Sequence, residues 1–227
     1  MRIFNCALLA GAALFAATAA SATTTITFDD GIGNLQPGEV SYADFNTLPT
    51  SGTITAGINF AFLTGSGPQG AQPATGDQGD RYLSVGTFLP SGFATFDFTA
   101  QAGGGVRQLG MDYGSADTYN SFVLHLSDGT TETYTGTDAI VNGVANGNQS
   151  STVTNGRLTF RPDGGLYITS IDLRSTGQAL EADNFGVIAA VPEPATWGMM
   201  LLGFGVMGVS LRRRRRSTPA LALAQAV

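Results

Sequence analysis

The sequence predicts an all-β fold: an antiparallel β-sandwich of the jelly-roll kind, flanked by an N-terminal signal peptide and a C-terminal transmembrane helix. Three observations predict it. Residues 23–189 are rich in Gly, Thr, Ser and Asp and show no sustained apolar period of 3.6 residues. Short runs of alternating apolar and polar residues occur there instead, separated by turn residues. Apolar segments of helical length lie only outside this region, one near each end of the chain.

The clearest local element is a hairpin over residues 121–135. Phe122, Leu124 and Leu126 alternate with other residues, so their side chains face one side of a strand. The Asp-Gly pair at 128–129 is a strong hairpin signal, and residues 131–135 then form the return strand.

The other strands follow from similar alternation. Apolar positions change parity near Thr169 and Ser170, which predicts a β-bulge there. The Gly-rich segments 65–79 and 103–105 are predicted to be loops. The remaining predicted strands cover residues 24–28, 53–63, 82–88, 93–98, 106–113, 152–160, 166–173 and 180–188.

The charge distribution excludes one class of function. The chain has no lysine, and residues 23–191 contain five arginines against sixteen Asp and Glu. An acidic body of this kind cannot neutralise a row of phosphates, so we expect no nucleic-acid partner.

The N-terminus predicts a secretory signal peptide over residues 1–22. Arg2 provides the positive charge, residues 6–17 form the apolar region, and Ala20 and Ala22 fit an A-x-A cleavage site before Thr23. The alternative is an uncleaved N-terminal anchor. Cleavage would remove the only cysteine and with it any disulfide or thiol chemistry.

The C-terminus predicts a membrane helix that ends in a basic stop. Residues 197–211 carry no charge, and Arg212, Arg213, Arg214, Arg215 and Arg216 follow. A helix over residues 195–211 would reach about 25 Å, slightly under the hydrocarbon core of a bilayer. The alternative is a helix of the soluble core, but five adjacent charges do not fit a core.

This C-terminal segment resembles a PEP-CTERM sorting signal of the PEP-x-x-W-A type. Pro192, Glu193, Pro194 and Trp197 match that pattern, and Gly198 stands where the pattern has Ala. The resemblance implies that an exosortase, a membrane protease of Gram-negative bacteria, recognises the signal and cuts near it.

The resemblance also implies a location and a domain organisation. The protein would pass through the inner membrane and then reach the cell surface or extracellular matrix, commonly in bacteria that make exopolysaccharide. The expected parts are a signal peptide (1–22), an ectodomain (23–189), the sorting signal (190–216) and a cytoplasmic tail (217–227).

A second resemblance covers the body. Residues 26–30, 106–114, 122–129 and 180–187 are similar to strands of many PEP-CTERM ectodomains. Those ectodomains are similar in turn to jelly-roll carbohydrate-binding modules, which implies exopolysaccharide as a candidate ligand.

Enzyme motifs are absent from the sequence. There is no G-x-S-x-G or H-E-x-x-H, and the only histidine, His125, is predicted on the strand face away from Phe122. We therefore expect no enzymatic activity.

Calcium is the candidate cofactor. If the first and last strands pair, as in a jelly roll, Asp29 and Asp30 would converge with Asp183 and Asn184. Oxygen ligands of this kind suit Ca²⁺. A second acidic pair lies at positions 77 and 80. The alternative is that all of these residues form turns and keep the surface soluble.

Three functions from different classes remain open. The leading one is a non-enzymatic envelope or matrix protein, followed by a carbohydrate-binding module and then by a secreted hydrolase. An exposed row of aromatic side chains on one concave sheet would favour sugar binding. A buried pair of carboxylates in a cleft would favour the hydrolase.

Overall fold

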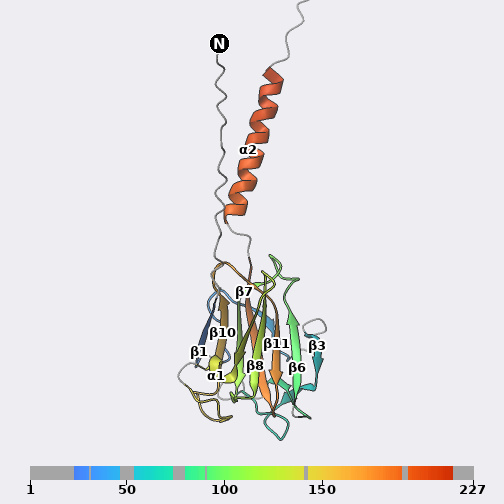
Figure 1. The fold of residues 1–227 in the computed structure, drawn as a ribbon, viewed down its shortest axis with the longest axis vertical. Helices are drawn as coiled ribbons and strands as arrows, with labels where there is room; N and C mark the ends of the chain where they lie inside the picture. Colours follow the sequence, from blue (N-terminus) through green and yellow to red (C-terminus); the bar gives the residue numbers. More distant parts are fainter. Residues whose placement is uncertain are drawn as a thin grey trace, which may run out of the picture.

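A computed structural model describes residues 23–30, 32–46, 54–73, 80–89, 91–140, 143–190 and 194–216 of the chain. These residues form twelve strands and two helices (Figure 1). The strands are β1 Thr24–Asp29, β2 Val40–Ala43, β3 Ile54–Ile58, β4 Phe60–Thr64, β5 Arg81–Val85, β6 Gly92–Asp97, β7 Val106–Gly114, β8 Asn120–Leu126, β9 Thr131–Thr135, β10 Gly156–Pro162, β11 Ile168–Ser175 and β12 Leu180–Ala189. The helices are α1 Gly136–Ala139 and α2 Pro194–Arg216.

The strands form one antiparallel sheet that is nearly closed into a barrel (Figure 1). One half has the order β9-β8-β11-β6-β3, and the other has the order β1-β10-β7-β12-β5-β4, with β2 also beside β12. A pairing between Ile168 of β11 and Val106 of β7 joins the two halves. The prediction of an antiparallel all-β body is confirmed, but the halves are continuous and not two separate sheets of a sandwich.

The core lies between the two halves, and aromatic rings bridge it. Phe96 of β6 stacks on Phe185 of β12 at 4.5 Å between ring centroids, and both rings are fully buried. The rings of Phe122 in β8 and Phe160 in β10 are 5.5 Å apart between their centroids. Each contact joins one half of the sheet to the other, so burial of these rings stabilises the curvature.

The predicted hairpin and bulge are both confirmed. In β8 and β9, Phe122 lies opposite Tyr134, and Gly129 in the turn has the positive φ that an Asp-Gly turn requires. The pairing of β11 with β8 shifts register between Ile168 and Ser170, where the parity change predicted the bulge.

Two local predictions were wrong. Residues 53–63 form two strands because Asn59 adopts a left-handed φ of 54° and breaks the run between β3 and β4. The short strand β2 was missed because its four residues make too short a run to stand out as a strand.

The jelly-roll prediction is also wrong in its key pairing. The first strand β1 pairs with β10, and β10 pairs with β7. The last strand β12 lies on the far side of β7. Two strands therefore separate β1 from β12. The full set of pairings decides this order, and local alternation carries no information about it.

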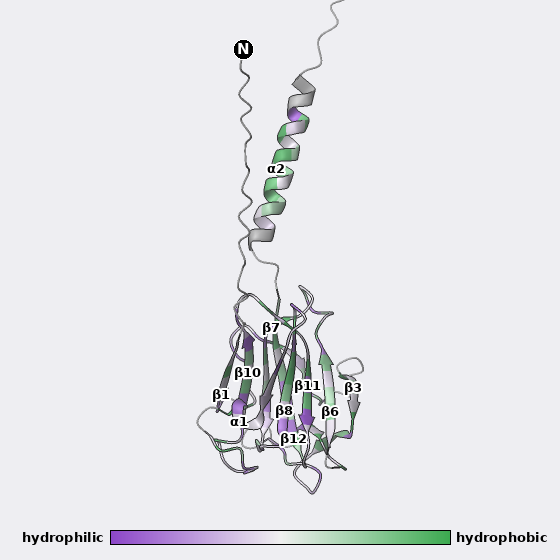
Figure 2. Ribbon diagram, viewed as in Figure 1, coloured by the Kyte–Doolittle hydropathy of each residue, from purple (hydrophilic) through white to green (hydrophobic). Residues whose placement is uncertain are grey.

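The C-terminal helix lies where the sequence predicted it. Every described side chain of α2, from Trp197 to Arg212, is exposed, and Figure 2 shows its apolar residues along the helix. The prediction that this helix spans a membrane is wrong, because no helix in the described part of the chain is sufficiently long and apolar to cross a membrane. Its uncharged stretch is shorter than the ~20 residues of a typical span, and four glycines reduce its hydropathy.

Candidate functional site

The C-terminal boundary of the β body lies at Ala190. This residue is buried, and its backbone N–H donates to the carbonyl oxygen of Gly105 at 2.9 Å. Gly103 approaches so closely that a Cβ there would lie 1.4 Å from the carbonyl oxygen of Ala190. The glycine loop therefore holds the end of β12 by contacts that a larger side chain would prevent.

This contact predicts the effect of Gly103→Ala. We expect the end of β12 to loosen and the free energy of unfolding to fall by about 1–3 kcal/mol, because the new methyl group collides with backbone and the residue has a φ of +84°. Limited proteolysis and urea unfolding of the full chain would measure both effects.

Gly129→Ala is the matched control, since Gly129 has a φ of +85° but nothing within 4 Å of an added Cβ. Its free energy of unfolding should fall only by the cost of placing an alanine at a positive φ. Equal losses in the two variants would show that Gly103 does not hold Ala190.

The predicted sorting residues follow this boundary. Pro192 and Glu193 lie outside the described residues, and so do the side chains of Pro194 and of Arg213 to Arg216. Pro194 begins α2, and the side chains of Trp197 and Arg212 are exposed on it. Residues 191–193 are therefore all that separates the last buried residue of the body from the helix.

Comparison with known proteins identifies this segment. Residues 190–216 match the family model of the PEP-CTERM protein-sorting motif. The motif implies an exported protein that an exosortase sorts to the cell surface. Searches of curated proteins and of solved structures found no significant match to the chain.

The two ends of the body lie together. Strands β1 and β12 run in opposite directions, so the start of β1 and the end of β12 are at the same end of the sheet (Figure 1). Thr23, the predicted first residue after cleavage, is exposed there, and its carbonyl accepts from the N–H of Asp163. Ala20 and Ala22, like all of residues 1–22 and 217–227, lie outside the described residues.

The residues predicted to bind calcium do not converge. Asp29 lies opposite Arg157, Arg157 opposite Asp112, and Asp112 opposite Asp183, in one row across four strands. At about 4.8 Å per strand, the backbones at Asp29 and Asp183 are roughly 14 Å apart. The pairing that the calcium hypothesis assumed is therefore absent, and Arg157 occupies the space between.

The other predicted ligands do not complete a site. Asp30 is exposed at the end of β1, and the amide of Asn184 donates to Asp112 at 2.9 Å. Asp77 lies outside the described residues, whereas Asp80 is described. Within the described ranges, no group of three or more His, Cys, Asp or Glu side chains could hold a metal ion.

Between these strands lies a buried charge cluster that the sequence analysis missed. Arg157 bonds Glu39 at 2.7 Å and Asp112 at 3.1 Å, and all three side chains are fully buried. Gly110 and Gly186 make room for it, since a Cβ at either would lie within 2.8 Å of the Arg157 guanidinium. The sequence signal that could have indicated this cluster is the pair Gly156-Arg157, an arginine next to a glycine within a predicted strand.

A polar pocket lies at the end of the body away from the sorting segment. Its volume is about 410 Å³, and its walls include Ser115 after β7, Asp117, Tyr119, and Glu181 at the start of β12. Glu181 accepts from the N–H of Ala71 at 2.9 Å and from the hydroxyl of Ser115 at 2.7 Å.

The pKa values of the two carboxyl groups of the pocket are both raised. Burial raises the pKa of Glu181 to about 8, and the nearby charge of Asp117 adds to this. Burial also raises the pKa of Asp117, although the hydrogen bond from Tyr119 opposes the shift. Both groups are therefore biased toward the neutral acid.

His125, the histidine that the sequence analysis considered for catalysis, is not among the residues that line the pocket. His125 is on the outer face of β8, away from Phe122 as predicted, and its Nε2 is 3.6 Å from Asp172. Among the described aromatic residues of the body, Phe88 is the one whose side chain is largely exposed, so they form no exposed row.

Proposed function

We propose that the protein is a non-enzymatic envelope or matrix protein, and that the exosortase frees its β body by cutting between Ala190 and α2. The observation that supports this most directly is the abrupt boundary at Ala190, which leaves residues 191–193 and Pro194 as the segment open to cleavage.

The chemistry of the motif fits a cleavage site. Pro192 and Pro194 have restricted φ angles and lack backbone N–H donors, so they disfavour helix through the motif. A protease requires an extended strand. On the body side, β12 is hydrogen-bonded to β7 along most of its length, which protects it from the same enzyme.

A non-enzymatic role is supported by the pocket. A glycosidase needs two carboxyl groups that flank the bond it cuts. Glu181 is buried and Asp117 is half-buried, and both are held within the wall: Glu181 accepts from the Ala71 N–H and the Ser115 hydroxyl, and Asp117 accepts from the Tyr119 hydroxyl. Carboxyl groups that are engaged in this way support a role in ligand binding more than one in catalysis.

A second candidate function is saccharide binding at this pocket. It is favoured by the polar lining of the cavity and by its position at the end of the body away from the sorting segment. It is compatible with the first function, because the two involve opposite ends of the molecule.

The sorting proposal predicts the fate of a proline variant. In a host with the exosortase, we expect the wild-type chain to be recovered as a form that begins at Thr23 and ends between Ala190 and Pro194. Pro192→Ala combined with Pro194→Ala should remain uncut at this end, because helix α2 can then extend back through the motif. Intact-mass analysis of cell and surface fractions measures both ends.

Pro37→Ala is the control, since Pro37 is an exposed proline in a turn of the body. It should be processed like wild type. Cutting of the double variant at the wild-type position, or a wild-type chain that stays full length, would contradict the proposal.

A further inference from the structure

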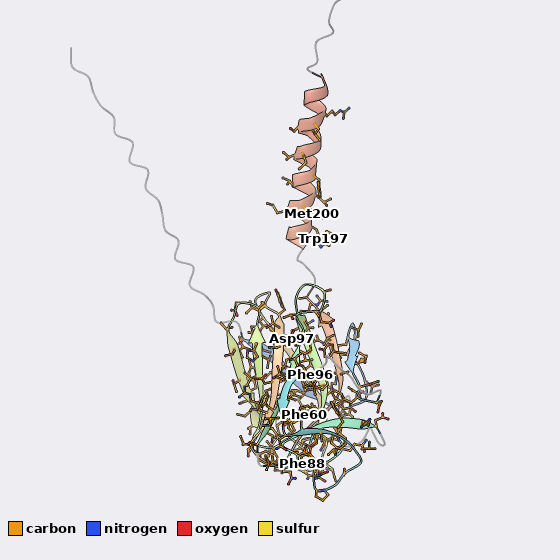
Figure 3. All side chains as sticks on the ribbon, turned by 90° about the vertical axis from the view of Figure 1, so that its right-hand side faces the viewer. Phe60, Phe88, Phe96, Asp97, Trp197 and Met200 are labelled. Carbon is orange, nitrogen blue, oxygen red and sulfur yellow. The ribbon has the colours of Figure 1, made fainter. Side chains whose placement is uncertain are left out.

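The polar pocket has a defined place relative to the sorting segment. Strands β7 and β12 run antiparallel along the body, with Glu181 opposite Gly114 at one end and Ala189 opposite Val106 at the other. Ala189 lies eight positions after Glu181 along β12, a distance of roughly 25–30 Å. Figure 3 shows the same polarity, with Phe88 at the end of the body far from α2. A ligand in the pocket would not touch the segment that the exosortase recognises.

The lining of the pocket selects a class of ligand. Its described residues offer carboxyl, hydroxyl and amide groups, and neither arginine nor histidine is among them. Phosphates and other anions would find no positive charge, and an apolar ligand would leave these polar groups without partners. A neutral ligand with many hydroxyl groups can both donate to and accept from them. The volume of about 410 Å³ falls in the range of small-molecule sites.

The pocket wall is held in position before any ligand binds. The hydroxyl of Tyr119 donates to Asp117 and lies within hydrogen-bond distance of the Gln178 carbonyl. The ring of Tyr119 packs against Gly177, where an added Cβ would lie 2.7 Å from ring atoms. The N–H of Ser115 donates to Asn155, which supports the left-handed φ of 42° at Ser115. Such fixed groups lose little entropy when they bind a ligand.

A loop that carries an exposed aromatic ring is hydrogen-bonded to this wall. The side-chain amide of Gln178 donates to the carbonyl of Thr87 at 2.7 Å, which ties the pocket to the loop that carries Phe88. Phe88 is 62% exposed. Asn59 accepts from the N–H of Phe88 and donates to the carbonyl of Leu89, so both residues are held in place. Exposed aromatic rings on rigid loops commonly stack against the apolar faces of bound ligands.

We propose that the pocket and Phe88 together bind a neutral saccharide chain, with one sugar unit in the pocket and a neighbouring unit against the ring of Phe88. This inference rests on the saccharide-binding candidate and names its site and ligand class. Acidic saccharides are disfavoured because the described lining offers no cationic side chain to pair with their carboxylates.

The test measures binding to the full chain, held in a zwitterionic detergent because α2 exposes apolar side chains. The probes are neutral tetrasaccharides of glucose, mannose and galactose, with tetragalacturonate as the acidic counterpart. Saturation-transfer NMR and calorimetry should detect at least one neutral probe and no binding of the acidic one. Tyr119→Phe and Phe88→Ser should each weaken binding by about fivefold, from loss of one hydrogen bond and of one stacking surface.

Matched variants separate binding from folding. Tyr134→Phe removes a similar hydroxyl, one that donates to Glu132 at 2.8 Å on the outer strand β9, and should bind like wild type. Gly67 lines the pocket, and an added Cβ there meets nothing within 4 Å. Gly67→Tyr should therefore reduce binding at least tenfold without unfolding the body.

Three results would overturn the inference: no neutral probe binds, tetragalacturonate binds as well as the neutral probes, or Tyr119→Phe and Tyr134→Phe bind alike. Intact-mass analysis reports processing independently. Correct processing without saccharide binding would contradict the binding site and leave the sorting proposal in place. Saccharide binding without processing would contradict the sorting proposal and leave the binding site in place.

Discussion

Arg157→Met is expected to lower the free energy of unfolding by about 3–5 kcal/mol, because it leaves two carboxylates buried without their cation. Arg157 contacts Glu39 and Asp112 at 2.7 and 3.1 Å, and none of the three side chains is exposed. Asn184 also loses a donor to its carbonyl. In a body of this size, the melting temperature should fall by roughly 10 °C. Calorimetry or thermal circular dichroism would measure it.

Arg174→Met is the matched control for this prediction. Arg174 also bonds an aspartate, Asp172 at 2.6 Å, but its side chain is 51% exposed. Solvent screens that pair, so its loss should cost less than about 1 kcal/mol. Similar destabilisation in the two variants would contradict the view that the buried cluster holds β10, β7 and the segment before β2 together.

Glu181 is expected to make the stability of the body depend on pH. Its pKa is raised from 4.5 to about 8 in the folded protein, so folding favours the protonated acid. The contribution is fully present below about pH 4.5 and is lost as pH rises toward 8, because only the unfolded chain then ionises freely. The loss is on the order of 4 kcal/mol. Urea unfolding at pH 5 and pH 8.5 would measure it.

Glu181→Gln should remove this part of the pH dependence, since the amide stays neutral at every pH. We expect the variant to gain stability relative to wild type at pH 8.5 and to differ little at pH 5. The difference between the two proteins isolates Glu181 from other groups with shifted pKa values, such as Asp112 and Asp117. Glu132→Gln on the outer strand β9 is the control, and this variant should still lose stability between pH 5 and pH 8.5 because it keeps Glu181. A profile of Glu181→Gln that parallels wild type would refute the prediction.

The features that the sequence determined by itself are those encoded in neighbouring residues. The hairpin depends on Asp128 and Gly129 with the alternation on either side, and the bulge near Ser170 depends on a change of parity within one strand. The sorting motif is likewise a local order of prolines, an apolar stretch and arginines, and it was recognised from the chain alone. Each of these is decided within a few residues, by turn geometry or side-chain periodicity.

Only the tertiary structure decided which strands lie side by side, and with them both polar sites. Arg157 and Glu39 are 118 residues apart in the chain, and Ser115 and Glu181 are 66 apart. A strand pattern shows which face is buried but not which strand lies next to it, because the packing of the whole core selects the pairing. The calcium prediction assumed that β1 lies beside β12, and this pairing is absent for the same reason. The packed core instead placed β10 and β7 between them, which buried Arg157 in that row and left Glu181 at the pocket.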